Sequence, residues 1–211
     1  MTEKLPTDVE TLIMEERKPL SLFQRMKMMK DAALGMNWLH SSNPIFIHRD
    51  LKLSNLLVDN NYKVLVCDFG LAQMKPKEVT NLGYDPHGSP LYMAPEVFVG
   101  DYNEKCDIYS FAIVLWEVLT QTQAFSDIDD DLAAFIHAVC DNGFRPDIPT
   151  DCPSRIRQLF ENCWRKEPSL RPSFSEIITR LDHILVEVSI ADDTGSRLGD
   201  TNFLGKVGAS Y

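Results

Sequence analysis

The residues best suited to chemistry lie in the stretch IHRDLKLSNLLVDNNYKVLVCDFG, residues 47–70. Asp50 is a carboxylate that can orient a hydroxyl group and accept its proton, and Lys52 is a cation that can contact a phosphate. Asn55 and Asp68 supply oxygen atoms of the kind that Mg²⁺ prefers. Taken alone, each has an ordinary structural explanation as a turn or cap residue. Their order and spacing together indicate phosphoryl transfer, which depends mainly on positioning and charge neutralisation.

A small hairpin is expected to position these residues. NLLVD and KVLVCD flank the turn sequence NNY, which predicts two short strands within 56–67. Asn55 then stands before the first strand and Asp68 after the second, so we expect Asp50, Asn55 and Asp68 to meet at one end of the hairpin. NPIFIH, just upstream, predicts a further short strand that runs into a turn.

The rest of the chain has mainly helical periodicity. Residues 21–41 predict a long helix with a methionine-rich apolar stripe, for which core packing is favoured over a partner surface. Residues 104–120 are apolar on nearly all sides, so the helix over 108–120 is expected to be the most buried element. The other expected segments are helices near 130–141, 153–164 and 173–188, a long loop over 69–95, and a flexible linker or tail over 189–211.

Composition excludes several functional classes. The 211 residues carry a net charge of -10 and no basic stripe, which argues against nucleic-acid binding. The five cysteines form no C-x-x-C pair and are odd in number, which argues against a disulfide framework or zinc site and favours the cytoplasm. The first ten residues do not form a signal peptide, and FAIVLW, the longest apolar run, is too short to span a bilayer.

HRDLKLSN, DFG and APE, in this order, resemble the catalytic loop, the metal-binding loop and the end of the activation segment of eukaryotic protein kinases. The resemblance covers residues 1–188. It implies a kinase domain whose fold is mainly α, a helical C-lobe in which a small β-hairpin carries the catalytic and metal loops. It also implies ATP and Mg²⁺ as the nucleotide and metal, and a protein as the phosphate acceptor.

The resemblance also implies roles for individual residues. Those with catalytic roles are Asp50, Lys52 and Asn55, and those that would hold magnesium are Asn55 and Asp68. Those expected around ATP are Glu3, Leu5, Leu57, Cys67 and Asp68. Those with structural roles are His48 and Phe69 in a packed spine, Glu96 paired with Arg171, and Asp107 holding the catalytic-loop backbone.

Two features define the type of kinase that the sequence resembles. Lys52, and Ser89 in GSPLYMAPE, match serine/threonine kinases, in which such a hydroxyl can bond both Asp50 and Lys52. CWRKEPSLRPSFSEI instead resembles the end of tyrosine kinases. This mixture is similar to the tyrosine-kinase-like group, and most similar to the amoebal kinases with a C-terminal SH2 domain. A domain of that kind could recruit a cytoplasmic kinase to a membrane.

Some expected kinase parts do not occur in these residues. The sequence has no G-x-G-x-x-G-x-V loop and no V-A-I-K lysine, and its first glycine is Gly35. MTEKLP resembles the hinge between the lobes, with Thr2 at the gatekeeper position, so we expect a hinge and C-lobe with the N-lobe missing. Two functions stay open: a Ser/Thr kinase with possible Tyr activity, weak or inactive as this chain alone, or a non-catalytic regulatory or substrate-binding fragment. A structural helical module with a chance motif is the least favoured.

A regulatory role is expected near the long loop. Arg49 precedes Asp50, and an arginine there can pair with a phosphate added to the loop. Thr80 is the favoured phosphate acceptor over Ser89, which matches a position used to align the substrate. The simpler alternative is that Arg49 is a solvated surface side chain.

Overall fold

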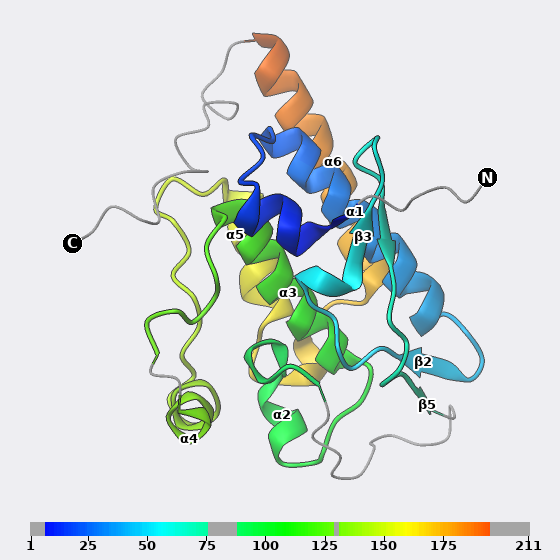
Figure 1. Ribbon diagram of the computed structural model, residues 1–211, viewed down its shortest axis with the longest axis vertical. Helices are drawn as coiled ribbons and strands as arrows, with labels where there is room; N and C mark the ends of the chain where they lie inside the picture. The colour runs from blue at the N-terminus through cyan, green and yellow to red at the C-terminus, as the bar shows by residue number, and fades with distance from the viewer. Residues whose placement is uncertain (1–6, 76–87, 129–130, 195–211) are drawn as a thin grey trace.

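The computed structural model describes residues 7–75, 88–128 and 131–194 (Figure 1). The α-helices in these ranges are α1 (Leu22–His40), α2 (Pro95–Phe98), α3 (Lys105–Thr120), α4 (Leu132–Ile136), α5 (Ser154–Cys163) and α6 (Phe174–Thr194). The strands are β1 (Thr7–Asp8), β2 (Ile45–Ile47), β3 (Leu56–Val58), β4 (Val64–Val66) and β5 (Gln73–Lys75). The fold is therefore mainly helical, as predicted, and it contains two small sheets. No described helix has the length and apolar character that a bilayer span requires.

The central helix is α3, which packs against α1 and α5 (Figure 1). Every residue from Cys106 to Thr120 is buried, and Leu115 and Trp116 are 0% and 4% exposed. The prediction that this helix is the most buried element is confirmed. Its all-round apolar sequence is the physical reason, because each face packs against another part of the domain.

The long helix α1 begins at a capping box. Ser21 accepts a hydrogen bond from the Gln24 backbone N–H, and the Gln24 side chain accepts one from the Ser21 N–H. The methionine-rich stripe faces the interior, where α1 packs along α6. Core packing is thus the correct explanation of the stripe.

The predicted hairpin is present. β3 pairs antiparallel with β4, with Leu57 opposite Leu65, and the strand predicted in NPIFIH is β2. β1 adds a third strand on the other side of β3. These strands place Asn55 directly before β3 and Asp68 shortly after β4, as expected.

The predicted loop over 69–95 is wrong in part. It contains β5, which pairs with β2, and a 3-10 turn at Pro90–Tyr92. A strand of three residues whose central Met74 is 59% exposed carries no sequence periodicity. Its pairing with β2 is set by tertiary contacts that the local sequence does not encode.

The predicted tail is also wrong at its start. α6 continues to Thr194, six residues beyond the predicted end at 188. Val188 and Ala191 are each 2% exposed, so the buried stripe of the helix continues past the expected boundary. Residues 195–211 lie outside the described residues.

A buried arginine joins α1 to the end of α3. Arg25 is 2% exposed, and its guanidinium donates to the carbonyl groups of Leu20, Val118 and Leu119 and to the side chain of Gln121. Burial lowers its pKa to about 10. The last carbonyls of a helix carry partial negative charge, so this cation caps the C-terminus of α3.

We predict that Arg25→Ala destabilises the domain by about 2–4 kcal/mol, because it leaves buried carbonyl groups without a donor. Urea unfolding of the 211-residue chain would measure the loss. The matched control is Lys27→Ala, an exposed position on the same helix, where we expect a change within about 0.5 kcal/mol. Equal losses in the two variants would contradict the capping role.

Candidate active site

Asp50, Lys52 and Ser89 form a closed ring of polar contacts. One carboxylate oxygen of Asp50 accepts from the Ser89 N–H at 3.0 Å and from its hydroxyl at 2.9 Å. Lys52 Nζ lies 3.1 Å from the other Asp50 oxygen and donates to the Ser89 hydroxyl at 2.9 Å. Asp50 is only 8% exposed. The ring thus joins the segment after β2 to the segment before α2, as the sequence predicted for these three residues.

Asn55 is fixed against the same carboxylate. Its side-chain amide nitrogen donates to the backbone oxygen of Asp50 at 2.7 Å and to a carboxylate oxygen of Asp50 at 3.0 Å. The short 3-10 turn Leu53–Asn55 brings the two residues together. Because both bonds use the amide nitrogen, the amide oxygen of Asn55 is the atom that can accept a metal or a donor.

Gly88 allows Ser89 to approach Asp50. Its φ is 128°, and a Cβ at this position would lie 2.7 Å from the backbone oxygen of Arg49. Any side chain would therefore force the two segments apart. A glycine is required here if both the N–H and the hydroxyl of Ser89 are to reach the carboxylate.

Asp107 holds the backbone that leads to Asp50. Its two carboxylate oxygens accept the backbone N–H groups of His48 and Arg49 at 2.8 and 3.0 Å, and His40 Nε2 lies 2.8 Å from one of them. Burial opposes the charge of Asp107, but the hydrogen bonds and nearby imidazoles outweigh it and lower its pKa below the ordinary value. Asp107 also stands in the first turn of α3, where a helix favours negative charge.

The residues after β4 lie beside this loop. Asp68 is exposed and has a φ of 59°, and its carboxylate accepts the Gly70 N–H at 3.2 Å. The ring of Phe69 contacts that of His48, with centroids 5.4 Å apart, while His48 itself is fully buried. The predicted His48–Phe69 contact is therefore present, although Phe69 remains 49% exposed.

Two expected ATP-contacting residues lie on or near the hairpin. Leu57 is half-buried in β3, opposite Leu65. The Cys67 thiol donates to the Asn55 carbonyl, and burial followed by the charges of Asp68 and Asp8 raises its pKa. Cys67 is therefore a neutral packed thiol. The expected hinge residues, Thr2, Glu3 and Leu5, lie outside the described residues.

The oxygen atoms of Asn55 and Asp68 are of the kind that magnesium prefers. The described residues contain no cluster of three or more His, Cys, Asp or Glu able to hold a metal ion. Asn55 and Asp68 offer one amide and one carboxylate. Mg²⁺ is commonly held by one or two protein oxygens together with substrate phosphates and water. The donor set therefore suits a metal that arrives with a nucleotide.

A buried ion pair connects α2 to the helical core. Arg171 is 2% exposed and donates to both carboxylate oxygens of Glu96, at 2.5 and 2.8 Å. This is the pair that the sequence predicted, in the bidentate geometry typical of strong arginine–carboxylate contacts. It joins α2 to the turn before α6.

The arrangement of these loops agrees with the comparison to known families. The family model described as protein tyrosine and serine/threonine kinase matches residues 5–181. The chain belongs to the protein kinase family.

Several curated kinases are similar over most of the chain. The dual specificity protein kinases shkC and shkA of Dictyostelium discoideum are 49% and 47% identical, over 97% and 96% of this chain. The probable serine/threonine-protein kinase SIS8 of Arabidopsis thaliana is 40% identical over 87% of it. The aligned part is 41%, 39% and 18% of these three relatives, so the chain spans well under half of their length.

In this kinase domain, Arg49 makes hydrogen bonds within the fold. Its guanidinium donates to the Leu71 carbonyl at 2.7 Å, to the Gln73 side chain at 2.9 Å and to the Tyr102 hydroxyl at 3.0 Å. Arg49 is therefore not a solvated surface side chain, and that alternative is wrong. Thr80, the favoured phosphate acceptor, lies outside the described residues.

Sequence reasoning missed Glu117 in this kinase domain. The residue is 1% exposed in the middle of α3, and its carboxyl group accepts from the Tyr92 hydroxyl at 2.8 Å and the Ala124 N–H at 2.9 Å. Burial raises its pKa to about 7. The available signal was an acidic residue between Trp116 and Val118 in an otherwise apolar run, because such a residue must find partners inside the core.

We predict that Glu117→Gln removes a pH dependence of stability. Between pH 4.5 and about 7 the folded state keeps a proton that the unfolded state has lost, so the contribution of Glu117 to stability falls as pH rises. The total loss is about 3 kcal/mol, because each pH unit between the unfolded and folded pKa values contributes ~1.4 kcal/mol. Glutamine keeps an oxygen for Ala124 and an amide for Tyr92.

Urea unfolding at pH 5 and pH 8 would test this prediction. The free energy of unfolding of Glu117→Gln, relative to that of the unmodified chain, should be higher at pH 8 than at pH 5. Glu161→Gln, at an exposed position on α5, serves as the control and should show no such change. A Glu117→Gln effect of equal size at both pH values would mean that Glu117 does not titrate in this range.

Proposed function

We propose that this kinase domain transfers the γ-phosphate of ATP to serine and threonine hydroxyls of a protein substrate, with tyrosine as a further acceptor, in intracellular signal transduction. The observation that carries the proposal is the ring of Asp50, Lys52 and Ser89 with Asn55 bound to Asp50. It brings a carboxylate and a cation into contact at a partly accessible position. A structural role alone does not require this combination.

In the proposed reaction, Asp50 orients the acceptor hydroxyl and takes its proton. Asn55 and Ser89 donate to the Asp50 carboxylate and so fix its orientation before the substrate arrives. Lys52 is close enough to the carboxylate to contact the phosphate that moves to the acceptor. Pre-oriented groups of this kind account for a large part of the rate in phosphoryl transfer.

We assign the nucleotide and its metal to the residues around the hairpin. Asn55 and Asp68 would hold Mg²⁺, which supplies neutralisation of phosphate charge when it is bound. Leu57 and Cys67 would contact ATP, together with Glu3 and Leu5. His48 and Phe69 would pack beneath this site, and their ring contact supports the assignment.

The type of kinase is also part of the proposal. Ser89 and Lys52 support Ser/Thr acceptors, while the relatives named dual specificity kinases support the addition of tyrosine. We further propose that the chain is related to the amoebal kinases that carry a C-terminal SH2 domain. The kinase domain would then end with α6 at residue 194 instead of 188, with 195–211 as the linker. The five cysteines are free, in keeping with a cytoplasmic location.

A non-catalytic fragment is the second candidate. The observation that favours it is that the 211 residues contain neither the glycine-rich loop nor the paired lysine of a kinase N-lobe. We propose that these residues by themselves transfer little phosphate. Positioning of reactants contributes about 7–11 kcal/mol in well-oriented cases, and part of it would be lost without a cover on the phosphates.

We predict that Asp50→Asn lowers phosphate transfer by about 10²–10⁴-fold in a longer chain that includes an N-lobe, because it removes the proton acceptor. Asp68→Ala should abolish transfer, because it removes a proposed magnesium ligand. Incorporation of labelled phosphate from ATP into a mixture of Ser-, Thr- and Tyr-containing peptides would measure both. Asp101→Asn, at an exposed position, is the control and should retain activity.

Phosphate-transfer assays of the 211-residue chain and of the longer chain distinguish the two candidate functions. Activity in the longer chain that is lost with Asp50→Asn supports the kinase. Inactivity of the longer chain would favour the non-catalytic fragment. Rapid transfer by the 211 residues alone, abolished by Asp50→Asn, would show that the other lobe matters less than we propose.

A further inference from the structure

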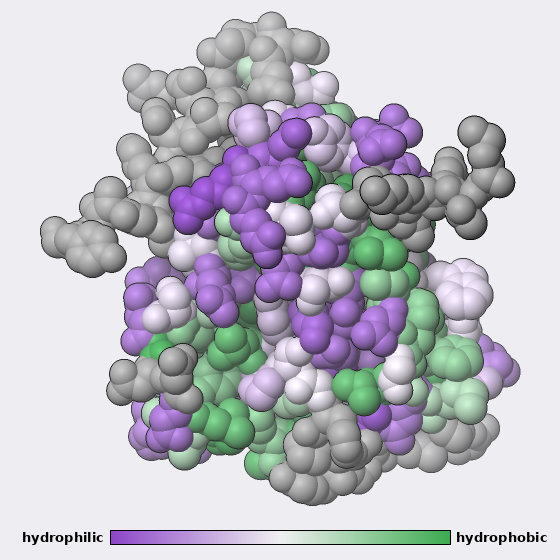
Figure 2. Space-filling model, viewed as in Figure 1, coloured by the Kyte–Doolittle hydropathy of each residue, from purple (hydrophilic) through white to green (hydrophobic). Residues whose placement is uncertain are grey.

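The strand β5 presents an apolar side chain to the outside of the domain. Met74, its central residue, is 59% exposed, and Figure 2 shows apolar surface where β2 and β5 lie in Figure 1. β5 pairs with β2 over three residues. Two strands of this length are at best marginally stable on their own. Contacts on the inner face of β5 must therefore help to hold it in the domain.

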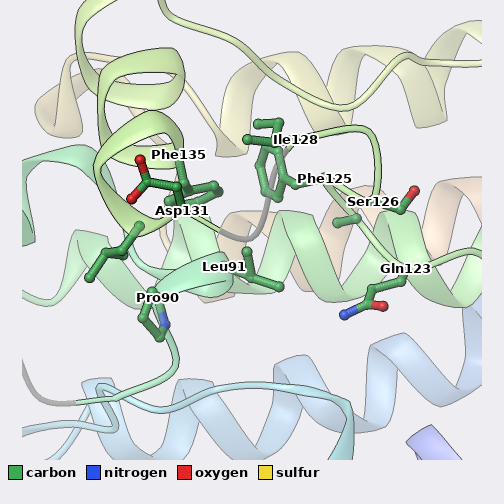
Figure 3. Close-up of a pocket in the computed structure, with 10 residues that line it drawn as sticks. Pro90, Leu91, Gln123, Phe125, Ser126, Ile128, Asp131 and Phe135 are labelled. Carbon is green, nitrogen blue, oxygen red and sulfur yellow. The ribbon is translucent and has the colours of Figure 1, made fainter.

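The inner face of β5 is polar. Gln73 and Lys75 lie on the face opposite to Met74, because successive side chains of a strand alternate. By contrast, the later turn Pro90–Tyr92 lies beside a mostly apolar pocket (Figure 3). Lys75 is only 6% exposed, and a buried ammonium group requires a partner.

The partner of Lys75 is Glu104, which directly precedes α3. Lys75 Nζ lies 2.6 Å from Glu104 Oε2. Burial opposes the charge of Glu104, but hydrogen bonds, first of all the one from Lys75, outweigh it and lower the pKa of this carboxyl group below its ordinary value. The start of a helix also favours a negative charge. The ion pair therefore holds the end of β5 against the N-terminus of α3.

The segment that includes β5 in turn holds the side chain of Arg49. Arg49 Nε donates to the Leu71 carbonyl at 2.7 Å, and Nη1 donates to the Gln73 side chain at 2.9 Å. The backbone N–H of Arg49 donates to Asp107 at 3.0 Å, in the first turn of α3. The contacts thus form a closed circuit. The N-terminus of α3 holds the Arg49 backbone through Asp107, and it holds the partners of the Arg49 side chain through Glu104.

We propose that Lys75 is a positioning residue for phosphate transfer. Its ion pair with Glu104 keeps β5 where it can hold Arg49, and Arg49 directly precedes Asp50. Loss of the ion pair would loosen β5 and its hold on the Arg49 side chain, so Asp50 would spend less time in its reactive orientation. The proposal rests on the proposed function for the reaction, whereas the hold on Arg49 can be measured without it.

Hydrogen exchange of arginine Nε–H groups in the 211-residue chain, followed by NMR, tests the hold on Arg49. Lys75→Met removes the ammonium group and keeps an unbranched side chain. The Nε–H of Arg49, which donates to Leu71, should then exchange about tenfold faster. The Nε–H of Arg25 donates to Leu20 beside the start of α1, and it should keep its exchange rate unless the whole domain is destabilised.

Further variants show whether the ion pair is responsible. Glu104→Gln should also accelerate exchange at Arg49. Its combination with Lys75→Met should have no more effect than the larger single change, because both substitutions remove the same interaction. The matched control is Lys30→Met, which breaks the ion pair of Lys30 with Asp182 between α1 and α6 and should leave exchange at Arg49 unchanged.

Kinetics of the longer chain that includes an N-lobe test the effect on phosphate transfer. Lys75→Met should lower kcat about fivefold and leave the KM for ATP unchanged, because a contact that orients Asp50 acts on the chemical step. The folded fraction of each variant, taken from urea unfolding, corrects kcat for any loss of folded protein. Lys30→Met should retain the kcat of the unmodified chain.

Several results would overturn the proposal. These are an unchanged exchange rate at Arg49 in Lys75→Met, equal acceleration at Arg49 and Arg25, additive effects of Lys75→Met and Glu104→Gln, or a raised KM with unchanged kcat. Exchange in Glu104→Gln decides the matter if Lys75→Met fails to fold. Because exchange requires no phosphate transfer, inactivity of the unmodified longer chain would contradict the proposed function, and the exchange rates would still decide the role of Lys75.

Discussion

The buried carboxylate of Asp107 is the contact on which the geometry of the catalytic loop depends. It accepts the N–H groups of His48 and Arg49, the two residues before Asp50, so it fixes the direction in which Asp50 leaves the core. Arg49 has a φ of 66°, a conformation that a residue with a long side chain rarely adopts. The two hydrogen bonds to Asp107 hold it there, and the polar contacts around Asp50 follow from that bend.

The same helix also positions the second half of the site. Along α3, Ser110 donates to the backbone oxygen of Tyr92, and Glu117 accepts from the Tyr92 hydroxyl. Tyr92 is three residues after Ser89, so α3 anchors the catalytic loop near its first turn and the segment carrying Ser89 farther along. A helix buried on all sides can do this because its own position is fixed by packing. The relative placement of Asp50 and Ser89 is therefore a property of the core.

The sequence predicted those parts whose signal is local. The hairpin over β3 and β4 follows from the turn sequence NNY, and the buried helix α3 follows from its apolar run. The Glu96–Arg171 pair joins residues 75 apart, and it was expected from the family resemblance instead. It did not predict β5, because three residues give no period and only the pairing with β2 makes them a strand. Nor did it predict the partners of Glu117, which lie 25 and 7 residues away and meet it only once the chain has folded.

The two buried acids of α3 show that hydrogen-bond donors and nearby cations can outweigh burial in setting the pKa of a carboxyl group. Asp107 stands at the helix N-terminus with backbone donors and two histidines nearby, and its pKa is lowered despite complete burial. Glu117 stands mid-helix with one hydroxyl and one amide as donors, too few to offset burial, and its pKa rises to about 7. The backbone that leads to Asp50 is thus held by a carboxylate that is charged near neutral pH, and a charged acceptor binds its donors strongly. Tyr92 and the backbone of Ala124 are instead held by Glu117, a group that changes charge in that range, so their attachment to the core is the more adjustable of the two.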